Sequence, residues 1–152
     1  MIPKTHIAAL RVIVNETRDK DIFWFLGGST NLALQGIDVS VNDIDLLSDE
    51  KGVYELEKSL KQYVVKPVFW RESETIASHY GQLNIDGVDV EIMGELDVKS
   101  AYRQNIKKDD ILMTKVDDFY IPCCSLKHEY DAYVKLGRPE KVVLIKKFLD
   151  KK

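Results

Sequence analysis

A glycine pair followed by serine is the first pattern in the chain that could do chemistry. Gly27-Gly28-Ser29 comes directly after an apolar run. Glycines let the backbone approach a ligand closely, N–H groups at the start of a helix attract phosphate oxygens, and Ser29 adds a hydroxyl donor. Such a turn is also an ordinary way to end a strand and cap a helix, so this pattern alone is weak.

Two aspartates two positions apart form the second pattern. Side chains two apart on a strand share a face, so Asp43 and Asp45 point to one side while Ile44 and Leu46 point into the core. Magnesium is commonly held by one or two carboxylates together with substrate phosphates. The alternative is an ordinary solvated strand face. Aspartate is a poor strand former and like charges repel, however, so the pair favours a bound cation.

A third acidic pattern lies in residues 88–92, which again alternate acids with apolar residues. If this strand lies beside that of Asp43, a third carboxylate reaches the same cations. In a two-metal site, such a group helps to hold the metal nearest the attacking hydroxyl and can accept its proton. Glu91 is the first choice for this role and Asp89 the second, and the other of the two faces solvent.

The elements that must position these residues are short and mixed. Residues 22–26 read as a buried strand that stops at the glycines, and residues 30–35 read as a helix with Ser29 as its N-cap and Gly36 at its end. Residues 43–47 read as a half-buried strand. Asp86-Gly87 is a strong two-residue hairpin turn that leads into a strand over residues 88–93.

The remaining segments complete an α+β pattern without strict βαβ alternation. Helical spacing of apolar residues marks residues 5–17, 51–63, 125–136 and 140–149, and extended patterns mark residues 64–70, 75–85, 111–116 and 118–121. We therefore expect a mixed β-sheet with flanking helices and a C-terminal helix pair. The prediction is one domain over residues 1–152, with a core over residues 20–122 and a helical tail over residues 123–152.

Composition narrows the class of protein. A chain of 152 residues with a net charge of −3 fits one globular domain, and its acidity disfavours long nucleic acid as a partner. No stretch has the length of a transmembrane helix, so we expect a cytoplasmic protein with no membrane partner. Cys123 and Cys124 are neighbours outside any metal-binding spacing, which favours reduced structural thiols.

The three patterns together resemble the DNA polymerase beta-like nucleotidyltransferase superfamily, in which a glycine-serine loop and a DxD pair precede a third carboxylate. More narrowly, residues 25–29 and 43–47 are similar to the small bacterial and archaeal members grouped with lincosamide and aminoglycoside adenylyltransferases and with antitoxin-type minimal nucleotidyltransferases. The tail, with Leu136-Gly137-Arg138-Pro139, is similar to the tail of many members. Many members have arginine and threonine just before the DxD, where this chain has Val41-Asn42.

The resemblance and the residues together predict a metal-dependent transfer of a nucleoside monophosphate to a hydroxyl, with release of pyrophosphate. The resemblance implies that the transferred group is AMP and that the donor is ATP. Two Mg²⁺ ions are the expected cofactors. The expected catalytic and metal-binding residues are Asp43, Asp45 and Glu91, and the expected nucleotide-binding residues are Gly27, Gly28 and Ser29. Lys127, Lys135 and Arg138 of the tail are candidates to face the triphosphate, although each also fits a solvated helix face.

The acceptor is the part of the reaction on which the sequence says least. Size and charge favour a small hydroxylated molecule or a partner protein, and a chain this short favours a homodimer in which one subunit helps to wall the other's cleft. The alternative is a non-catalytic or antitoxin-type nucleotide-binding module that acts on a partner protein. A retained group of three clustered carboxylates argues for activity, because it is costly to keep without a metal.

Overall fold

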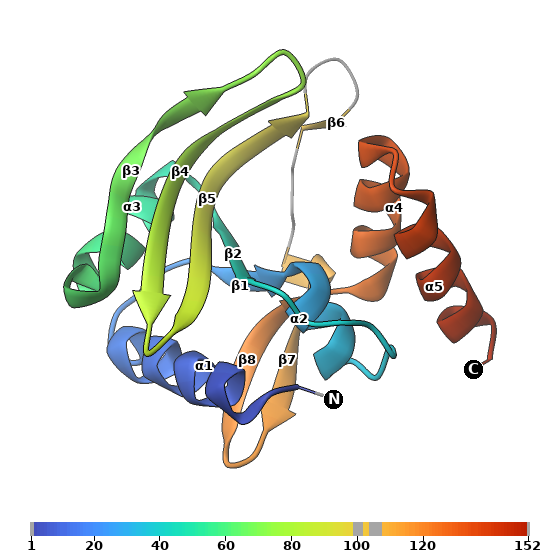
Figure 1. Cartoon of the computed structure of the whole chain (residues 1–152), viewed down its shortest axis with the longest axis horizontal. Coiled ribbons are helices and arrows are strands. Elements are labelled where there is room, and N and C mark those ends of the chain that lie inside the picture. Colours follow the sequence, from blue (N-terminus) through green and yellow to red (C-terminus); the bar gives the residue numbers. More distant parts are fainter. Residues whose placement is uncertain (1, 99–101, 104–107, 152) are drawn as a thin grey trace.

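A twisted mixed sheet carries the candidate residues (Figure 1). The computed structural model describes residues 2–98, 102–103 and 108–151. Its strands lie in the order β3-β4-β5-β2-β1-β8-β7, and β6 pairs with β5. The strands are β1 Phe25–Gly27, β2 Ile44–Ser48, β3 Val64–Glu72, β4 Ile76–Ile85, β5 Val88–Val98, β6 Tyr102–Arg103, β7 Ile111–Val116 and β8 Phe119–Cys124.

Both parallel and antiparallel pairs occur in this sheet. Strand β2 runs parallel to β5, and β1 runs parallel to β8, whereas β1 and β2 are antiparallel. The hairpin of β4 and β5 turns at Asp86 and Gly87, whose φ angles of 50° and 92° are both in the left-handed region that a two-residue turn requires. The α+β class with a mixed sheet is therefore confirmed, as is the hairpin turn.

Helices pack on the sheet and beside it. The helices are α1 Lys4–Thr17, α2 Gly28–Leu34, α3 Glu50–Ser59, α4 Leu126–Leu136 and α5 Pro139–Asp150, with short 3-10 turns at Lys61–Tyr63 and Lys108–Asp110. None of the helices in this part of the chain combines the length and apolar composition needed to cross a membrane. The predicted C-terminal helix pair is confirmed, and α4 and α5 stand side by side in Figure 1.

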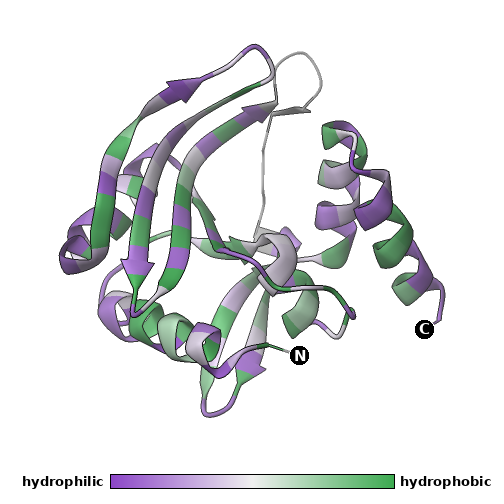
Figure 2. Cartoon of the chain, in the orientation of Figure 1, coloured by the Kyte–Doolittle hydropathy of each residue, from purple (hydrophilic) through white to green (hydrophobic). Residues whose placement is uncertain are grey.

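The main core lies between α1, α3 and one face of the sheet. Apolar side chains of the two helices, such as Leu10 and Leu56, pack there against Ile44, Leu46 and Val90. Because side chains alternate along a strand, the acidic neighbours of these residues face the other way. Figure 2 shows this alternation of hydrophilic and hydrophobic residues along β4 and β5. The alternation puts the acids on the face turned away from α1 and α3.

Two local expectations were wrong. The strand predicted over residues 22–26 begins only at Phe25, and the Ile22 N–H donates to the Lys20 carbonyl in a turn instead of to a neighbouring strand. Ser29 is not an N-cap: α2 begins at Gly28, with Gly27 in the cap position. The glycine pair enters the helix one residue earlier than its sequence indicates, and this frees the Ser29 hydroxyl for another partner.

Candidate active site

Three neighbouring strands bring the predicted residues into one row. Gly27 of β1 pairs with Asp45 of β2, and Asp45 pairs with Glu91 of β5. Directly opposed residues on adjacent strands project to the same face of a sheet, so the glycine turn, Asp45 and Glu91 lie side by side. Asp43, two residues before Asp45, lies in the bend just before β2, which begins at Ile44 and not at Asp43 as predicted.

The glycine turn is shaped to admit the Asp45 carboxylate. Gly28 has a φ of +71°, which side chains other than glycine rarely tolerate, and a Cβ placed there would lie 2.3 Å from Asp45 Oδ2. The residue type at position 28 is therefore set both by backbone conformation and by the close approach of Asp45.

Hydrogen bonds hold residues 42 and 43, just before β2, against α2. The Ser29 hydroxyl accepts from the Asn42 N–H at 3.1 Å, and the Thr30 hydroxyl donates to the Asp43 carbonyl at 3.1 Å. The Asp43 side chain itself is exposed. The loop and the aspartate pair thus form one unit, and the Ser29 hydroxyl keeps its own hydrogen to donate.

The carboxylates repel one another and are partly cut off from water. Burial, followed by the charge of Glu91 and a hydrogen bond with it, raises the pKa of Asp45 to about 8. The pKa of Asp43 is raised as well, by desolvation first and then by Glu91 and Asp89. Such a group is stabilised by a cation, since an opposite charge nearby favours the ionised form.

The donor set fits a hard divalent cation that arrives with a nucleotide. Asp43, Asp45 and Glu91 offer only oxygen atoms, the ligands that magnesium prefers. Within residues 2–98, 102–103 and 108–151, no three His, Cys, Asp or Glu side chains form a ready metal cage. Magnesium does not need one, because it is usually held by one or two carboxylates together with substrate phosphates.

Glu91 and Asp89 share a face of β5 but differ in their surroundings. Glu91 Oε1 accepts from the Tyr80 hydroxyl at 2.6 Å, and that hydroxyl accepts from Gln82 Nε2 at 2.9 Å. Asp89 is exposed and accepts from Asn84 Nδ2 at 2.9 Å, near the hairpin turn. Glu91 is thus the acid in register with Asp45, and Asp89 lies at the edge of the group.

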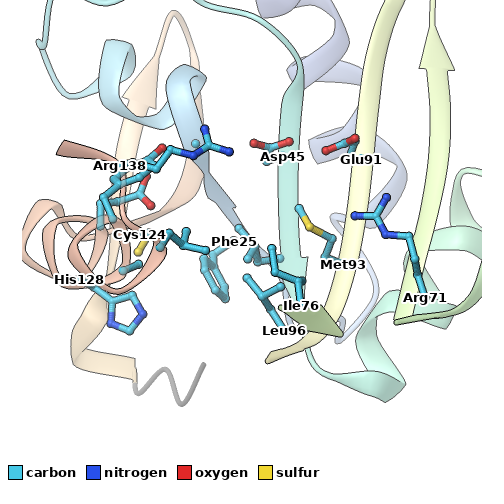
Figure 3. A pocket seen from close by; sticks show the side chains of 16 residues that line it. Phe25, Asp45, Arg71, Ile76, Glu91, Met93, Leu96, Cys124, His128 and Arg138 are labelled. Atoms are coloured by element: carbon cyan, nitrogen blue, oxygen red, sulfur yellow. The ribbon is translucent and has the colours of Figure 1, made fainter. Parts of the chain in front are cut away.

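A cavity of about 220 Å³ opens beside Asp45 and Glu91 (Figure 3). In Figure 3 the two carboxylates lie at one end, with Arg138 on the side of the glycine turn and Arg71 on the side of Glu91. Apolar side chains make up much of the remaining lining, among them Phe25, Leu47, Ile76, Met93 and Leu96. The cavity therefore joins an acidic end to an apolar interior between two arginines.

The family model for aminoglycoside-2''-adenylyltransferase matches residues 9–144. The chain belongs to this adenylyltransferase family. A candidate nucleotidyltransferase from Thermotoga maritima is 36% identical, with a TM-score of 0.83 over 100% of this chain and 97% of that one. No curated protein sequence is a significant match.

Two solved adenylyltransferases share the fold at lower identity. ANT(2'')-Ia, in complex with adenylyl-2''-tobramycin, is 13% identical with a TM-score of 0.57, over 97% of this chain and 99% of that one. Lincomycin-bound LnuA, a lincosamide antibiotic adenylyltransferase, is 17% identical with a TM-score of 0.60, over 91% of this chain and 95% of that one. Together with the family match, these likenesses confirm the resemblance seen in the sequence and identify the chain as a nucleotidyltransferase.

Glu129 is a buried acid that lines this cavity and that the sequence patterns do not single out. It lies on α4, is only 7% exposed, and accepts hydrogen bonds from Asn31 Nδ2 at 2.9 Å and from the Gly28 N–H. Burial outweighs these bonds and raises its pKa to about 7. A signal was present, because Glu129 shares a helix face with Leu126 and Tyr133, where an acid is out of place.

The raised pKa values predict that the metal-free protein loses stability as pH rises. Asp45 titrates at about 8 in the folded chain, against an ordinary value of 3.8, and Glu129 shifts in the same direction. The folded state therefore holds extra protons between these values, and the free energy of unfolding falls from about pH 4 to about pH 8, by at most about 1.4 kcal/mol per pH unit for each group. Urea unfolding in EDTA across this range measures the fall.

Asp45→Asn is the matched variant for this measurement, because it removes the titrating carboxyl and keeps the shape of the side chain. Its unfolding free energy should change less with pH than that of the wild type. Magnesium with a nucleotide should raise the unfolding free energy of the wild type near pH 8, because ligands that bind only the folded state stabilise it. A wild-type stability that rises between pH 5 and pH 8 without metal would contradict the assignment.

Proposed function

We propose that the chain transfers AMP from ATP to a hydroxyl of a small acceptor and releases pyrophosphate, with magnesium as its cofactor. The observation that carries the proposal is the row formed by the glycine turn, Asp45 and Glu91 on adjacent strands. In the proposed reaction, the turn would bind phosphate, Asp45 would bind the metal and Glu91 would take a proton, all beside one reacting phosphorus.

The glycine turn and the first turn of α2 would bind the triphosphate. The first N–H groups of a helix have no partner within the helix. Glu129 takes that of Gly28, which leaves the next N–H groups and the Ser29 hydroxyl to donate to phosphate oxygens. The guanidinium of Arg138, on the same side of the cavity, is placed to add positive charge.

Asp43 and Asp45 would hold magnesium, and bound magnesium offsets the negative charge that builds on the phosphates during transfer. Glu91 would orient the acceptor hydroxyl and take its proton. The hydroxyl oxygen forms a bond to the α-phosphorus as the bond from that phosphorus to the bridging oxygen breaks, and pyrophosphate leaves with that oxygen. Tyr80 holds Glu91 in place through its hydrogen bond of 2.6 Å.

ATP carrying a label at either its α- or its γ-phosphate tests this reaction. The α-label should move to the acceptor and the γ-label should leave in pyrophosphate, with tobramycin, lincomycin and simpler hydroxylated compounds offered as acceptors. Binding of α,β-methylene-ATP, measured by calorimetry, should weaken at least about tenfold when EDTA removes magnesium. Equal binding with and without magnesium would contradict the proposed metal site. Phosphorylation of an acceptor by the γ-label would contradict the reaction.

The single domain over residues 1–152 and the homodimer remain predictions. Sedimentation of the full chain with and without magnesium and α,β-methylene-ATP measures whether the chain forms the dimer.

A further inference from the structure

The order of the strands sets the side from which the acceptor enters. The glycine turn follows β1, Asp45 lies on β2, and Glu91 lies on β5, so the row runs from the phosphate-binding turn towards β4 and β3. An in-line transfer needs the hydroxyl opposite the leaving pyrophosphate. The acceptor therefore occupies the half of the cavity on the Glu91 side.

Arg71 lies on that side of the cavity. Its guanidinium carbon lies 3.5 Å from the centre of the Tyr80 ring, and the Tyr80 hydroxyl donates to Glu91. In the described part of the chain, no carboxylate forms a salt bridge with it. Stacking holds the guanidinium in place and leaves its N–H groups available to a ligand in the cavity.

The rest of this half is apolar. Ile76, Met93 and Leu96 line it, and Figure 3 shows their side chains gathered between Arg71 and Phe25. With a volume of about 220 Å³, the cavity lies below the range of roughly 300–1,000 Å³ that is usual for pockets that enclose drug-sized ligands. A compact apolar body fits this space better than a molecule of several sugar rings.

The acids that line the cavity already have partners or roles. Asp45 would hold the metal and Glu91 would orient the acceptor hydroxyl, and Glu129 is buried against Asn31 and Gly28. Among the described lining residues, no further carboxylate is left to pair with ammonium groups. A polycation such as tobramycin would also meet the positive charge of Arg71.

We propose that the acceptor is a compact hydroxylated molecule with an apolar body and one anionic group, which Arg71 binds. This inference rests on the proposed function and narrows its acceptor. It separates this chain from relatives of the aminoglycoside type by charge, because Arg71 would attract an anionic acceptor and repel the ammonium groups of an aminoglycoside.

Three probes with the same hydroxylated ring and different charges test the inference: 3-(4-hydroxyphenyl)propionate, tyrosol and tyramine. With magnesium and α,β-methylene-ATP present, the propionate should bind the wild type at least about tenfold more tightly than tyramine, with tyrosol between them. Titration followed by NMR of the probe measures each affinity. With α-labelled ATP, label transfer should follow the same order.

Variants of the two arginines separate the acceptor from the nucleotide. Arg71→Ala should remove the preference for the anion, Arg71→Glu should reverse it, and Arg71→Lys should keep most of it. Binding of α,β-methylene-ATP should stay within about twofold in Arg71→Ala. Arg138→Ala, on the other side of the cavity, should weaken binding of that analogue and leave the preference for the anion unchanged.

Four outcomes would overturn the inference. The first is a wild type that binds tyramine or tobramycin more tightly than the propionate, and the second is an Arg71→Ala variant that still prefers the propionate. The third is an Arg71→Ala variant that loses binding of α,β-methylene-ATP but keeps the preference for the propionate. The fourth is a wild type that binds α,β-methylene-ATP but none of the three probes. Failure of the wild type to bind the nucleotide analogue would instead count against the proposed function, so the two failures are distinguishable.

Discussion

Gly28→Ala is expected to lower the rate of nucleotidyl transfer by at least about 100-fold, because misplacing a reacting group by about 1 Å has effects of that size. The new Cβ would lie 2.3 Å from Asp45 Oδ2 and 3.2 Å from Asp45 Cγ. The carboxylate would have to swing away from the glycine turn, and the row of turn, Asp45 and Glu91 would be broken. Transfer from α-labelled ATP measures the loss.

Gly137→Ala is the matched control for this prediction. Gly137 has the same φ of +71°, but a Cβ there meets nothing within 4 Å. Both substitutions carry the same backbone strain, about 1–2 kcal/mol in the free energy of unfolding, so only the contact with Asp45 differs between them. Urea unfolding should show a loss of stability in both variants, larger in Gly28→Ala by the cost of moving Asp45, and transfer should fall only in Gly28→Ala. Equal activity in the two variants would show that the contact at Asp45 does not matter.

The acidic row could be predicted because strand periodicity fixes the face of each side chain. Asp43 and Asp45 alternate with core residues, and so do Asp89 and Glu91, so the sequence alone puts each pair on one face. Sequence could not establish that β2 and β5 are neighbours, since strand pairing depends on contacts distant in the chain. The structure shows that β2 and β5 pair in parallel, and that Asp45 lies directly opposite Glu91 and not Asp89.

The missed residues reach the site from distant elements. Arg71 lies near the end of β3, and the pairing of β3 with β4 brings its guanidinium over the Tyr80 ring. Glu129 comes from α4, about 100 positions along the chain from its partner Asn31. The prediction that Ser29 is the N-cap is wrong, because the helix begins at Gly28 with Gly27 as its N-cap. The local sequence does not determine which residue of this turn begins the helix. Arg138, which the sequence offers as a candidate to face the triphosphate, lines the cavity.

Asp45→Asn and Glu91→Gln are expected to lower transfer by about 100-fold to 10,000-fold, the range found when a group that moves a proton or holds a catalytic metal is removed. Both changes keep the size of the side chain. In Glu91→Gln the amide oxygen can still accept from the Tyr80 hydroxyl, so the contact at 2.6 Å need not be lost. Loss of activity without loss of folding would then report the missing negative charge.

Asp89→Asn is the control for Glu91→Gln, because the two acids lie two positions apart on the same face of β5. Asn84 can still donate to the amide oxygen at position 89, and the side chain there is exposed. We expect its transfer rate to stay within about threefold of the wild type, since screened charges at an exposed position have small effects. A large loss in Asp89→Asn with full activity in Glu91→Gln would instead make Asp89 the third carboxylate.

The double variant Asp45→Asn/Glu91→Gln distinguishes a shared role from two separate ones. If both carboxylates act on the same transferred group, removing the second costs little once the first is gone, because residues that work as a unit are strongly non-additive. The two side chains interact in the folded chain, where burial first, and then the charge of Glu91 and a hydrogen bond with it, raise the pKa of Asp45. We therefore expect the double variant to be no more than about tenfold slower than the slower single variant. Effects that multiply in full would show that Glu91 acts independently of the metal-binding pair.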